Sequence, residues 1–320
     1  MADGANAGSV AGSRTVTVVS VINYKGGVGK TTLTANLGAE LAARGQKILL
    51  VDLDPQASLT FGFYQPDIWE KELADEKTIL QWFGASLDSG KAPDLASFVV
   101  TPKAAKERVK ASHPDGQLDL LASHLGLVDV DLDFAAELGG SRFQHGSPRF
   151  VPLLRLLADA LAGPSFAHYD LILIDCAPNF TMVTRTGIVA SDYLLVPSKA
   201  DYISTIGISY LRRKLSELER DYNRVASAVG APAISPTILG VVFTMVQVSR
   251  DDLIGALRPY VEQVRELELR VLSHSVRENK TTFASSGLSG IPVVLDRRSH
   301  PSVLYELEQI ALELRALVRT

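Results

Sequence analysis

The sequence contains only one cysteine, Cys176, among its 320 residues. One cysteine cannot form an intramolecular disulfide or a cysteine-rich metal site, and so low a count is typical of a reducing compartment. No apolar run approaches the roughly 18–20 residues that a membrane-spanning helix needs. The first thirteen residues are rich in alanine, glycine and serine and lack the basic and apolar regions of a signal peptide. We therefore expect a cytoplasmic protein with a flexible tail over residues 1–14.

The sequence also lacks an excess of basic charge. Its 32 Lys and Arg residues stand against 36 Asp and Glu residues, which gives a formal net charge of -4. The bulk charge therefore repels phosphate slightly, and any contact with nucleic acid has to come from a local basic patch. The composition, with 46% hydrophobic residues, is that of an ordinary globular protein. Because neither a repeat nor a linker divides the chain, we expect a single domain over residues 15–320.

Buried strands alternate with amphipathic helices along most of the chain. Apolar and β-branched runs predict strands at residues 16–23, 48–51, 118–121, 171–175, 193–197 and 238–245. Helical spacing of apolar residues predicts helices at residues 31–44, 152–161, 211–229 and 303–317. The first strand, helix and strand have the spacing of a βαβ unit, whose crossover joins parallel strands. We predict an α/β fold with a doubly wound, mostly parallel sheet flanked by helices, and a weaker pattern over residues 61–146.

A glycine-rich segment joins the first predicted strand to the first predicted helix. It differs from the Walker A pattern G-x-x-x-x-G-K-[ST] only at the first position, where Tyr24 replaces glycine. Its glycines let backbone N–H groups approach phosphate oxygens, and the N-terminus of the following helix favours an anion. Lys30 is placed to contact the β- and γ-phosphates, and the Thr31 hydroxyl to ligate Mg²⁺. The predicted nucleotide-binding residues of this P-loop are Gly26, Gly27, Val28, Gly29, Lys30, Thr31 and Thr32.

Carboxylates follow two of the predicted strands. Asp52 and Asp54 come after the strand at residues 48–51, and Asp175 ends the apolar run at residues 171–175, in the form of a Walker B strand. Parallel sheets bind ligands at the carboxyl ends of their strands, so we expect Asp175 to support Mg²⁺ there. Asp52 or Asp54 could also be a helix cap after the strand.

These segments together resemble the ParA/MinD superfamily, the P-loop ATPases with a deviant Walker A box. The resemblance rests on the box Lys25-Gly-Gly-Val-Gly-Lys30-Thr-Thr, on Val51-Asp-Leu-Asp-Pro-Gln56, on the strand ending at Asp175 and on residues 196–207 and 240–245. It implies that Lys25 reaches across a dimer interface to the nucleotide of the partner subunit. It also implies that Asp54 orients the attacking water, that Asp52 holds Mg²⁺ through water, and that Thr244 lies near the adenine.

Two features choose among the branches of this superfamily. MinD-type proteins end in a basic helix that enters the membrane surface, whereas the last helix here carries Glu306, Glu308 and Glu313, which anionic lipid would repel. We therefore expect no membrane partner. A single cysteine excludes the relatives that need paired cysteines for a metal cluster. The resemblance is closest to the ParA/Soj-type partition ATPases.

Partition ATPases bind nucleoid DNA without sequence specificity as ATP-bound dimers. Their C-terminal segment bears basic residues that contact DNA, and the resemblance implies this role for Arg277, Lys280, Arg297 and Arg298. The usual Ile-Pro-Arg start of that segment is here His274-Ser-Val-Arg277. Contacts to phosphate would make the binding sensitive to salt. A second basic cluster at residues 212–214 is more simply a solvated helix face.

The sequence thus predicts a Mg²⁺-dependent ATPase that dimerises with ATP, binds DNA at the nucleoid and turns over slowly alone. A ParB-like partner or cargo adaptor would stimulate hydrolysis and switch it off, in plasmid or chromosome partition. One alternative is a ParA-like positioning factor for a protein cargo. The other is a metabolic ATP-dependent synthetase on the same fold, which would not need Lys25.

Overall fold

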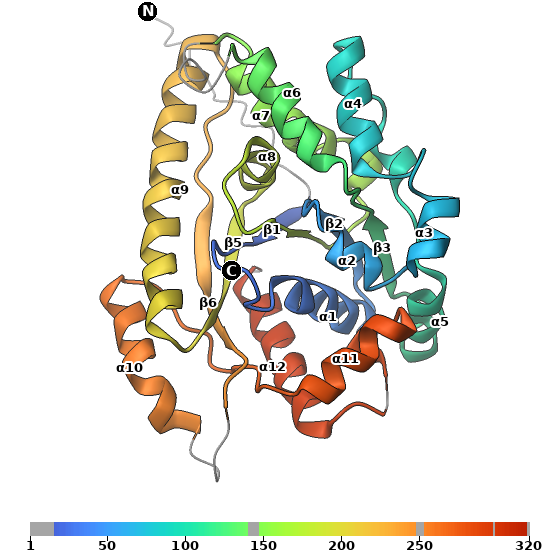
Figure 1. Cartoon of the computed structure of the whole chain (residues 1–320), viewed down its shortest axis with the longest axis vertical. Coiled ribbons are helices and arrows are strands. Elements are labelled where there is room, and N and C mark those ends of the chain that lie inside the picture. The colour runs from blue at the N-terminus through green and yellow to red at the C-terminus, as the bar shows by residue number, and fades with distance from the viewer. Residues whose placement is uncertain (1–15, 140–146, 248–252, 297, 319–320) are drawn as a thin grey trace, which may run out of the picture.

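The computed structural model describes residues 16–139, 147–247, 253–296 and 298–318. Six parallel strands form one sheet at the centre of the molecule, in the order β3-β2-β4-β1-β5-β6 (Figure 1). The strands are β1 Thr17–Val21, β2 Lys47–Asp52, β3 Gln117–Leu121, β4 Leu171–Asp175, β5 Tyr193–Lys199 and β6 Thr237–Thr244. The predicted doubly wound α/β fold is confirmed.

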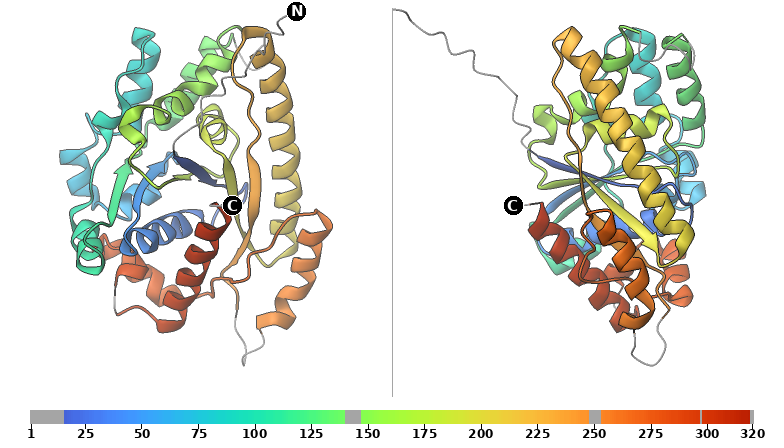
Figure 2. Two further views of the ribbon diagram at one scale, coloured as in Figure 1. Left: turned by 180° about the vertical axis from the view of Figure 1, so that it is seen from behind. Right: turned by 90° about the vertical axis from the view of Figure 1, so that its left-hand side faces the viewer.

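Helices cover both faces of the sheet, with α1 and α12 on one face and α6, α7 and α8 on the other, as Figure 2 shows from behind and from the side. Alternate residues of each strand point to opposite faces, so Leu171 and Leu173 of β4 join one core and Ile172 and Ile174 the other. Because both faces of the sheet are buried, the strands are continuous apolar runs in the sequence. The helices that flank the sheet are α1 Lys30–Ala43, α5 Lys103–Ser112, α6 Leu127–Glu137, α7 Phe150–Leu161, α8 Met182–Ala190, α9 Tyr202–Val229 and α12 Pro301–Leu317.

Residues 61–139, the described part of the region 61–146 where the sequence pattern is weak, contain more structure than predicted. Short helices here surround β3, and α4 buries Trp82 and Phe83 completely. Of these helices, α2 and α3 have only four and seven residues, too few turns for a clear helical period in the sequence. The remaining elements are α2 Ser58–Phe61, α3 Pro66–Glu72, α4 Ile79–Ser89, α10 Leu253–Glu266, α11 Lys280–Ser289 and the 3₁₀ turns η1 Leu95–Phe98, η3 Pro164–Phe166 and η4 Val293–Leu295.

The C-terminal helix α12 packs on the domain, as the sequence predicted. Leu307 and Ile310 are fully buried in the core that α12 shares with α1. Within the described residues, no helix combines the length and the apolar character that crossing a membrane requires.

The sheet brings three functional segments to one edge. Strand β4 lies between β1 and β2, in a register that pairs Asp175 with Val21 on one side and with Asp52 on the other. The loop after β1 is the predicted P-loop, and the loop after β2 carries Asp54. Because all these strands are parallel, their carboxyl ends form a single ligand-binding edge.

Candidate nucleotide-binding site

The loop between β1 and α1 has the backbone conformation of a phosphate-binding loop. Gly27 and Gly29 have φ angles of 68° and 81°, in the left-handed region that favours glycine. Gly29 is also the N-cap of α1. The carbonyl of Val28 accepts a hydrogen bond of 2.7 Å from Thr244 Oγ1, which fastens the loop to the end of β6. The loop is therefore held in shape by the protein itself.

The structure explains why Tyr24 can replace the first Walker A glycine. Tyr24 is not among the described residues with positive φ, so this position does not require glycine. Its ring lies against Phe180, with centroids 5.8 Å apart, and against the edge of Tyr210, with centroids 4.6 Å apart. Tyr24 thus links the P-loop to the loop after β4 and to α9.

Lys30 is the first residue of α1 and is only 6% exposed. Its Nζ donates to the carbonyl oxygen of Lys25 at 3.4 Å. Burial lowers the pKa of Lys30, although the nearby Asp175 and Asp54 oppose this effect. A bound phosphate would compensate for the lost hydration of the ammonium group, as expected of a P-loop lysine.

Thr31 and Asp175, two of the three predicted Mg²⁺ ligands, are in direct contact, and their role in binding Mg²⁺ stays a prediction. Thr31 Oγ1 donates to Asp175 Oδ2 at 2.7 Å, and Asp175 is completely buried. Burial, together with the charge of Asp52, raises the pKa of Asp175 well above its usual range, against the effects of Thr31 and Lys30. Hydroxyl and carboxylate oxygens are the donors that Mg²⁺ prefers. Among the described residues, no group of three or more His, Cys, Asp or Glu side chains is arranged so that it could hold a metal ion.

Asp52 and Asp54 have different surroundings. Both Asp52 oxygens accept hydrogen bonds: Oδ2 from the N–H and hydroxyl of Thr60, each at 2.8 Å, and Oδ1 from the N–H of Asp54 at 3.1 Å. Burial raises the pKa of Asp52 to about 7, although the Thr60 hydrogen bonds oppose it. Asp52 therefore shapes the loop that presents Asp54, whose Oδ1 accepts from the N–H of Gln56 at 2.9 Å. The water-mediated contact of Asp52 to Mg²⁺ stays a prediction.

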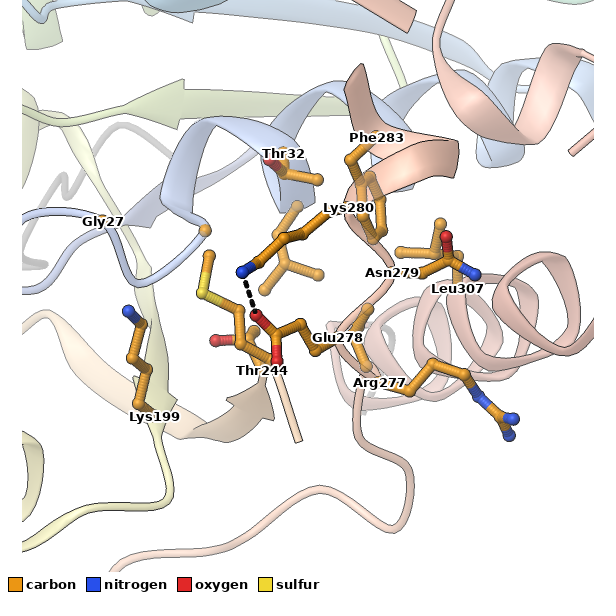
Figure 3. A pocket seen from close by; sticks show the side chains of 14 residues that line it. Gly27, Thr32, Lys199, Thr244, Arg277, Glu278, Asn279, Lys280, Phe283 and Leu307 are labelled. Atoms are coloured by element: carbon orange, nitrogen blue, oxygen red, sulfur yellow. Dashed lines mark ion pairs between the residues drawn. The ribbon is translucent and has the colours of Figure 1, made fainter. Parts of the chain in front are cut away.

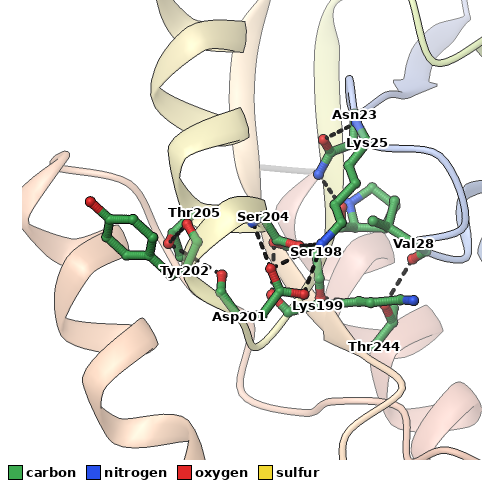
Figure 4. A network of polar contacts seen from close by, with 11 residues as sticks. Asn23, Lys25, Val28, Ser198, Lys199, Asp201, Tyr202, Ser204, Thr205 and Thr244 are labelled. Atoms are coloured by element: carbon green, nitrogen blue, oxygen red, sulfur yellow. Dashed lines mark hydrogen bonds and ion pairs between the residues drawn. The ribbon is translucent and has the colours of Figure 1, made fainter.

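Lys25 is directed toward the start of α9 (Figure 4). Its Nζ lies 2.9 Å from both carboxylate oxygens of Asp201 and 3.0 Å from Ser204 Oγ. Asp201 is also the N-cap of α9, because it accepts from the N–H of Ser204 at 2.8 Å. Burial works against the ionisation of Asp201, but the hydrogen bonds from Lys25 and Ser204 outweigh it and lower its pKa. The Lys25 and Asp201 side chains are 30% and 40% exposed, so this ion pair can open toward solvent.

A cavity of about 440 Å³ lies beside the P-loop (Figure 3). Its volume is typical of a small-molecule site. Thr244 lines it next to Gly29, and the predicted position of Thr244 near an adenine stays a prediction. The sequence did not reveal the other lining residues that come from strand ends and from the C-terminal segment: Lys199, Met245, Val276, Glu278, Asn279, Phe283 and Leu307. Lys199 and Met245 could have been found, because they stand at and just after the carboxyl ends of β5 and β6.

The predicted DNA contacts do not form one free basic surface. Arg277 points away from the cavity and its Nε bonds Glu306 Oε1 of α12 at 2.7 Å (Figure 3). Lys280 reaches into the cavity, with its Nζ 3.6 Å from Glu278 Oε1. Arg298 pairs with Asp296 at 3.0 Å. Arg297 lies outside the described residues.

The structure also contains a basic helix, α5, that was not predicted from the sequence. The exposed residues of α5 include four cations, Lys103, Lys106, Arg108 and Lys110, against the single anion Glu107. Arg108 lies close enough to Asp296 to lower its pKa, behind the larger effect of Arg298. The helix therefore adjoins the turn that carries Arg298. The sequence signal that could have revealed this helix is the group of four cations within residues 103–110.

The glycine loop, the buried Lys30 and the pair of Thr31 with Asp175 at the edge of a parallel sheet define a P-loop nucleotide-binding protein. A family model described as an AAA domain matches residues 16–227. The chain therefore belongs to this family, within the ParA/MinD superfamily that its Walker A box resembles.

Relatives agree with this assignment. The chromosome-partitioning ATPase Soj of Treponema pallidum is 30% identical over 209 residues, which cover 65% of this chain and 67% of that protein. The sporulation initiation inhibitor protein Soj of Bacillus subtilis is 28% identical over 206 residues, or 64% and 67% of the two chains. An uncharacterised protein of Mycobacterium tuberculosis is 31% identical over 194 residues, 61% of this chain. The chain spans about half the length of that relative, 50%.

Solved structures share the fold over nearly the whole chain. The structure of McdA from Cyanothece has a TM-score of 0.65 at 21% identity and covers 93% of this chain and 98% of its own. Cobyrinic acid a,c-diamide synthase from Mycobacterium smegmatis, with bound ADP and magnesium, has a TM-score of 0.62 at 22% identity, with 95% and 96% covered.

Proposed function

We propose that this protein is a ParA-type ATPase switch for plasmid or chromosome partition. ATP drives a homodimer, the dimer binds DNA non-specifically at the nucleoid within the cytoplasm, and a ParB-like partner stimulates hydrolysis and release. The observation that carries the proposal is the position of Lys25. It belongs to the P-loop, yet its ammonium group is turned to the start of α9 and held by a partly exposed ion pair.

Each residue has a definite task in this proposal. The backbone N–H groups of Gly27 and Gly29 and the ammonium of Lys30 bind the phosphates, while Thr31 and Asp175 hold Mg²⁺. Bound Mg²⁺ supplies positive charge to the β- and γ-phosphates. Asp54, on the loop that Asp52 shapes, orients the attacking water.

Lys25 then acts in trans. In a dimer whose nucleotide faces meet, it leaves Asp201 and contacts the nucleotide of the partner subunit, where it stabilises the charge that develops on the phosphates. Without this contact and without the ParB-like partner, hydrolysis is slow.

The test is binding to non-specific duplex DNA with ATP, with ADP and without nucleotide. We expect binding only with ATP, with an affinity that falls steeply as salt rises. Lys30→Ala should abolish it, and Lys71→Ala, which changes an exposed lysine of α3 away from the P-loop, should not. Binding that is equal with ADP and ATP would contradict the switch.

A ParA-like positioning factor for a protein cargo is the second candidate. It is favoured by the carboxylate partners of Arg277, Lys280 and Arg298, which reduce the free basic surface. An ATP dimer that ignores DNA would support it. A synthetase on this fold would retain its activity in Lys25→Ala, whereas the ATPase switch would lose ATP-dependent dimerisation.

A further inference from the structure

Two helices expose apolar side chains at helical spacing. The first group, the α9 patch, consists of Tyr202, Ile203, Ile206 and Tyr210, of which Ile203 is 69% and Ile206 51% exposed. The second, the α6 patch, consists of Val128 and Leu132 of α6 and of Leu125 in the turn just before it, which are 54%, 66% and 55% exposed. Single exposed apolar residues are ordinary, but groups of them gathered on one helix mark an interaction site.

Both patches lie at the nucleotide-binding edge of the sheet. Helix α9 begins just after the carboxyl end of β5, and Leu125 comes just after the carboxyl end of β3. In the sheet, β5 and β3 are separated by β1, β4 and β2, which carry the P-loop, Asp175 and Asp52. Helix α9 and the start of α6 therefore follow strands that lie on either side of the three strands carrying the nucleotide site.

The two patches have charged borders of opposite sign. The α9 patch is bordered by two cations beside the Tyr210 ring, Arg213 at 4.9 Å and Lys214 at 5.7 Å from its centre, which both pair with the single carboxylate of Glu217. At the other end of the patch, Lys25 balances the charge of Asp201, so the border of the α9 patch keeps a net positive charge. The α6 patch is bordered by the exposed carboxylates of Asp129 and Asp133. Two copies of one patch would bring like charges together, whereas one patch against the other brings opposite charges together.

We propose that the α9 patch of each subunit packs on the α6 patch of the other in the ATP-bound homodimer. The inference rests on the proposed function, since it names the surface through which that dimer forms. In a two-fold dimer every contact between two different patches occurs twice, so both patches of both subunits are covered.

This arrangement also connects the dimer to Lys25. Asp201, which holds Lys25, immediately precedes Tyr202 and Ile203 of the α9 patch. A subunit that docks on the patch therefore arrives beside the ion pair that must open for Lys25 to act in trans.

Cysteine cross-linking tests the pairing, because Cys176 is the only cysteine of the chain and is buried. Ile206→Cys and Leu132→Cys proteins are purified separately, mixed with a slowly hydrolysed ATP analogue and treated with a short bismaleimide. We expect a covalent dimer in the mixture and none from either variant alone. The matched control is Val229→Cys, at the far end of α9 and 53% exposed, which should not link to Leu132→Cys.

Sedimentation of the wild type and of each variant with the analogue separates the outcomes. If the wild type stays monomeric with ATP, the proposed function and the patch pairing fail together. If the variants dimerise but the mixture does not cross-link, the patch pairing alone is wrong. Cross-linking of Ile206→Cys with itself would instead place α9 against α9. A variant Ile206→Lys that dimerises like the wild type but no longer responds to an activating protein would assign the patch to that protein and overturn the pairing.

Discussion

The ion pair between Lys25 and Asp201 should restrain dimerisation, and the substitution Asp201→Asn isolates this effect. Asparagine caps a helix as well as aspartate does, so α9 should keep its N-cap hydrogen bond to the N–H of Ser204. The charge that holds Lys25 is lost, however. We therefore expect the variant to form the ATP-bound dimer more readily than the wild type.

The exposure of the pair sets the size of the effect. With side chains 30% and 40% exposed, the pair contributes at most about 1 kcal/mol, and about 0.5 kcal/mol after allowance for screening by solvent. Two such pairs open in each dimer, so the gain is about 1 kcal/mol. This corresponds to a dissociation constant that is about fivefold lower.

Sedimentation equilibrium with a slowly hydrolysed ATP analogue, over a range of protein concentrations, measures this constant. Lys25→Ala is the opposite control and should weaken the dimer, because it removes the contact to the partner's nucleotide. Thermal unfolding without nucleotide checks that the cap is intact. A dissociation constant for Asp201→Asn that equals or exceeds the wild-type value, at unchanged thermal stability, would refute the idea that Lys25 must leave Asp201.

Other changes test the site and its surroundings. Gly29→Ala should lower the free energy of unfolding in urea by about 1–2 kcal/mol, because the φ of Gly29 is 81°. Gly26→Ala is the control and should leave this free energy unchanged, because Gly26 has no positive φ and open space surrounds the added Cβ. Asp175→Asn should raise the melting temperature of the nucleotide-free protein, because burial disfavours the carboxylate. The same substitution should abolish the further rise in melting temperature that ATP and Mg²⁺ cause, and a retained rise would contradict the Mg²⁺ role of Asp175. Burial raises the pKa of Cys176 to about 12, so its reaction with a disulfide reagent at pH 8 should be at least about a hundredfold slower than in urea. If α5 contacts DNA, Lys106→Ala should reduce the slope of log affinity against log salt by about one, and an unchanged slope would exclude it.

The sequence by itself determined the P-loop and the strands around it. Residues 24–32 are contiguous, and the left-handed glycine positions and the following helix are local properties, so the pattern could be read without the fold. Strands buried on both faces are equally visible, because every residue of β4 from Leu171 to Ile174 must be apolar. Asp52 and Asp175 were found because each ends such a strand, and Asp54 because it stands two residues after one.

Only the tertiary structure decided which segments meet. No local sequence pattern places β4 between β1 and β2. This strand order brings Asp175 beside Asp52 and within hydrogen-bond distance of Thr31. The partner of Lys25 lies 176 residues away in the chain, and Arg277 is held by Glu306 of α12. The apolar periodicity of α9 predicted the buried side of the helix, but the exposure of Ile203 and Ile206 depends on what packs around them. Contacts between distant segments follow from the packing of helices on the sheet, and this packing is a property of the whole chain.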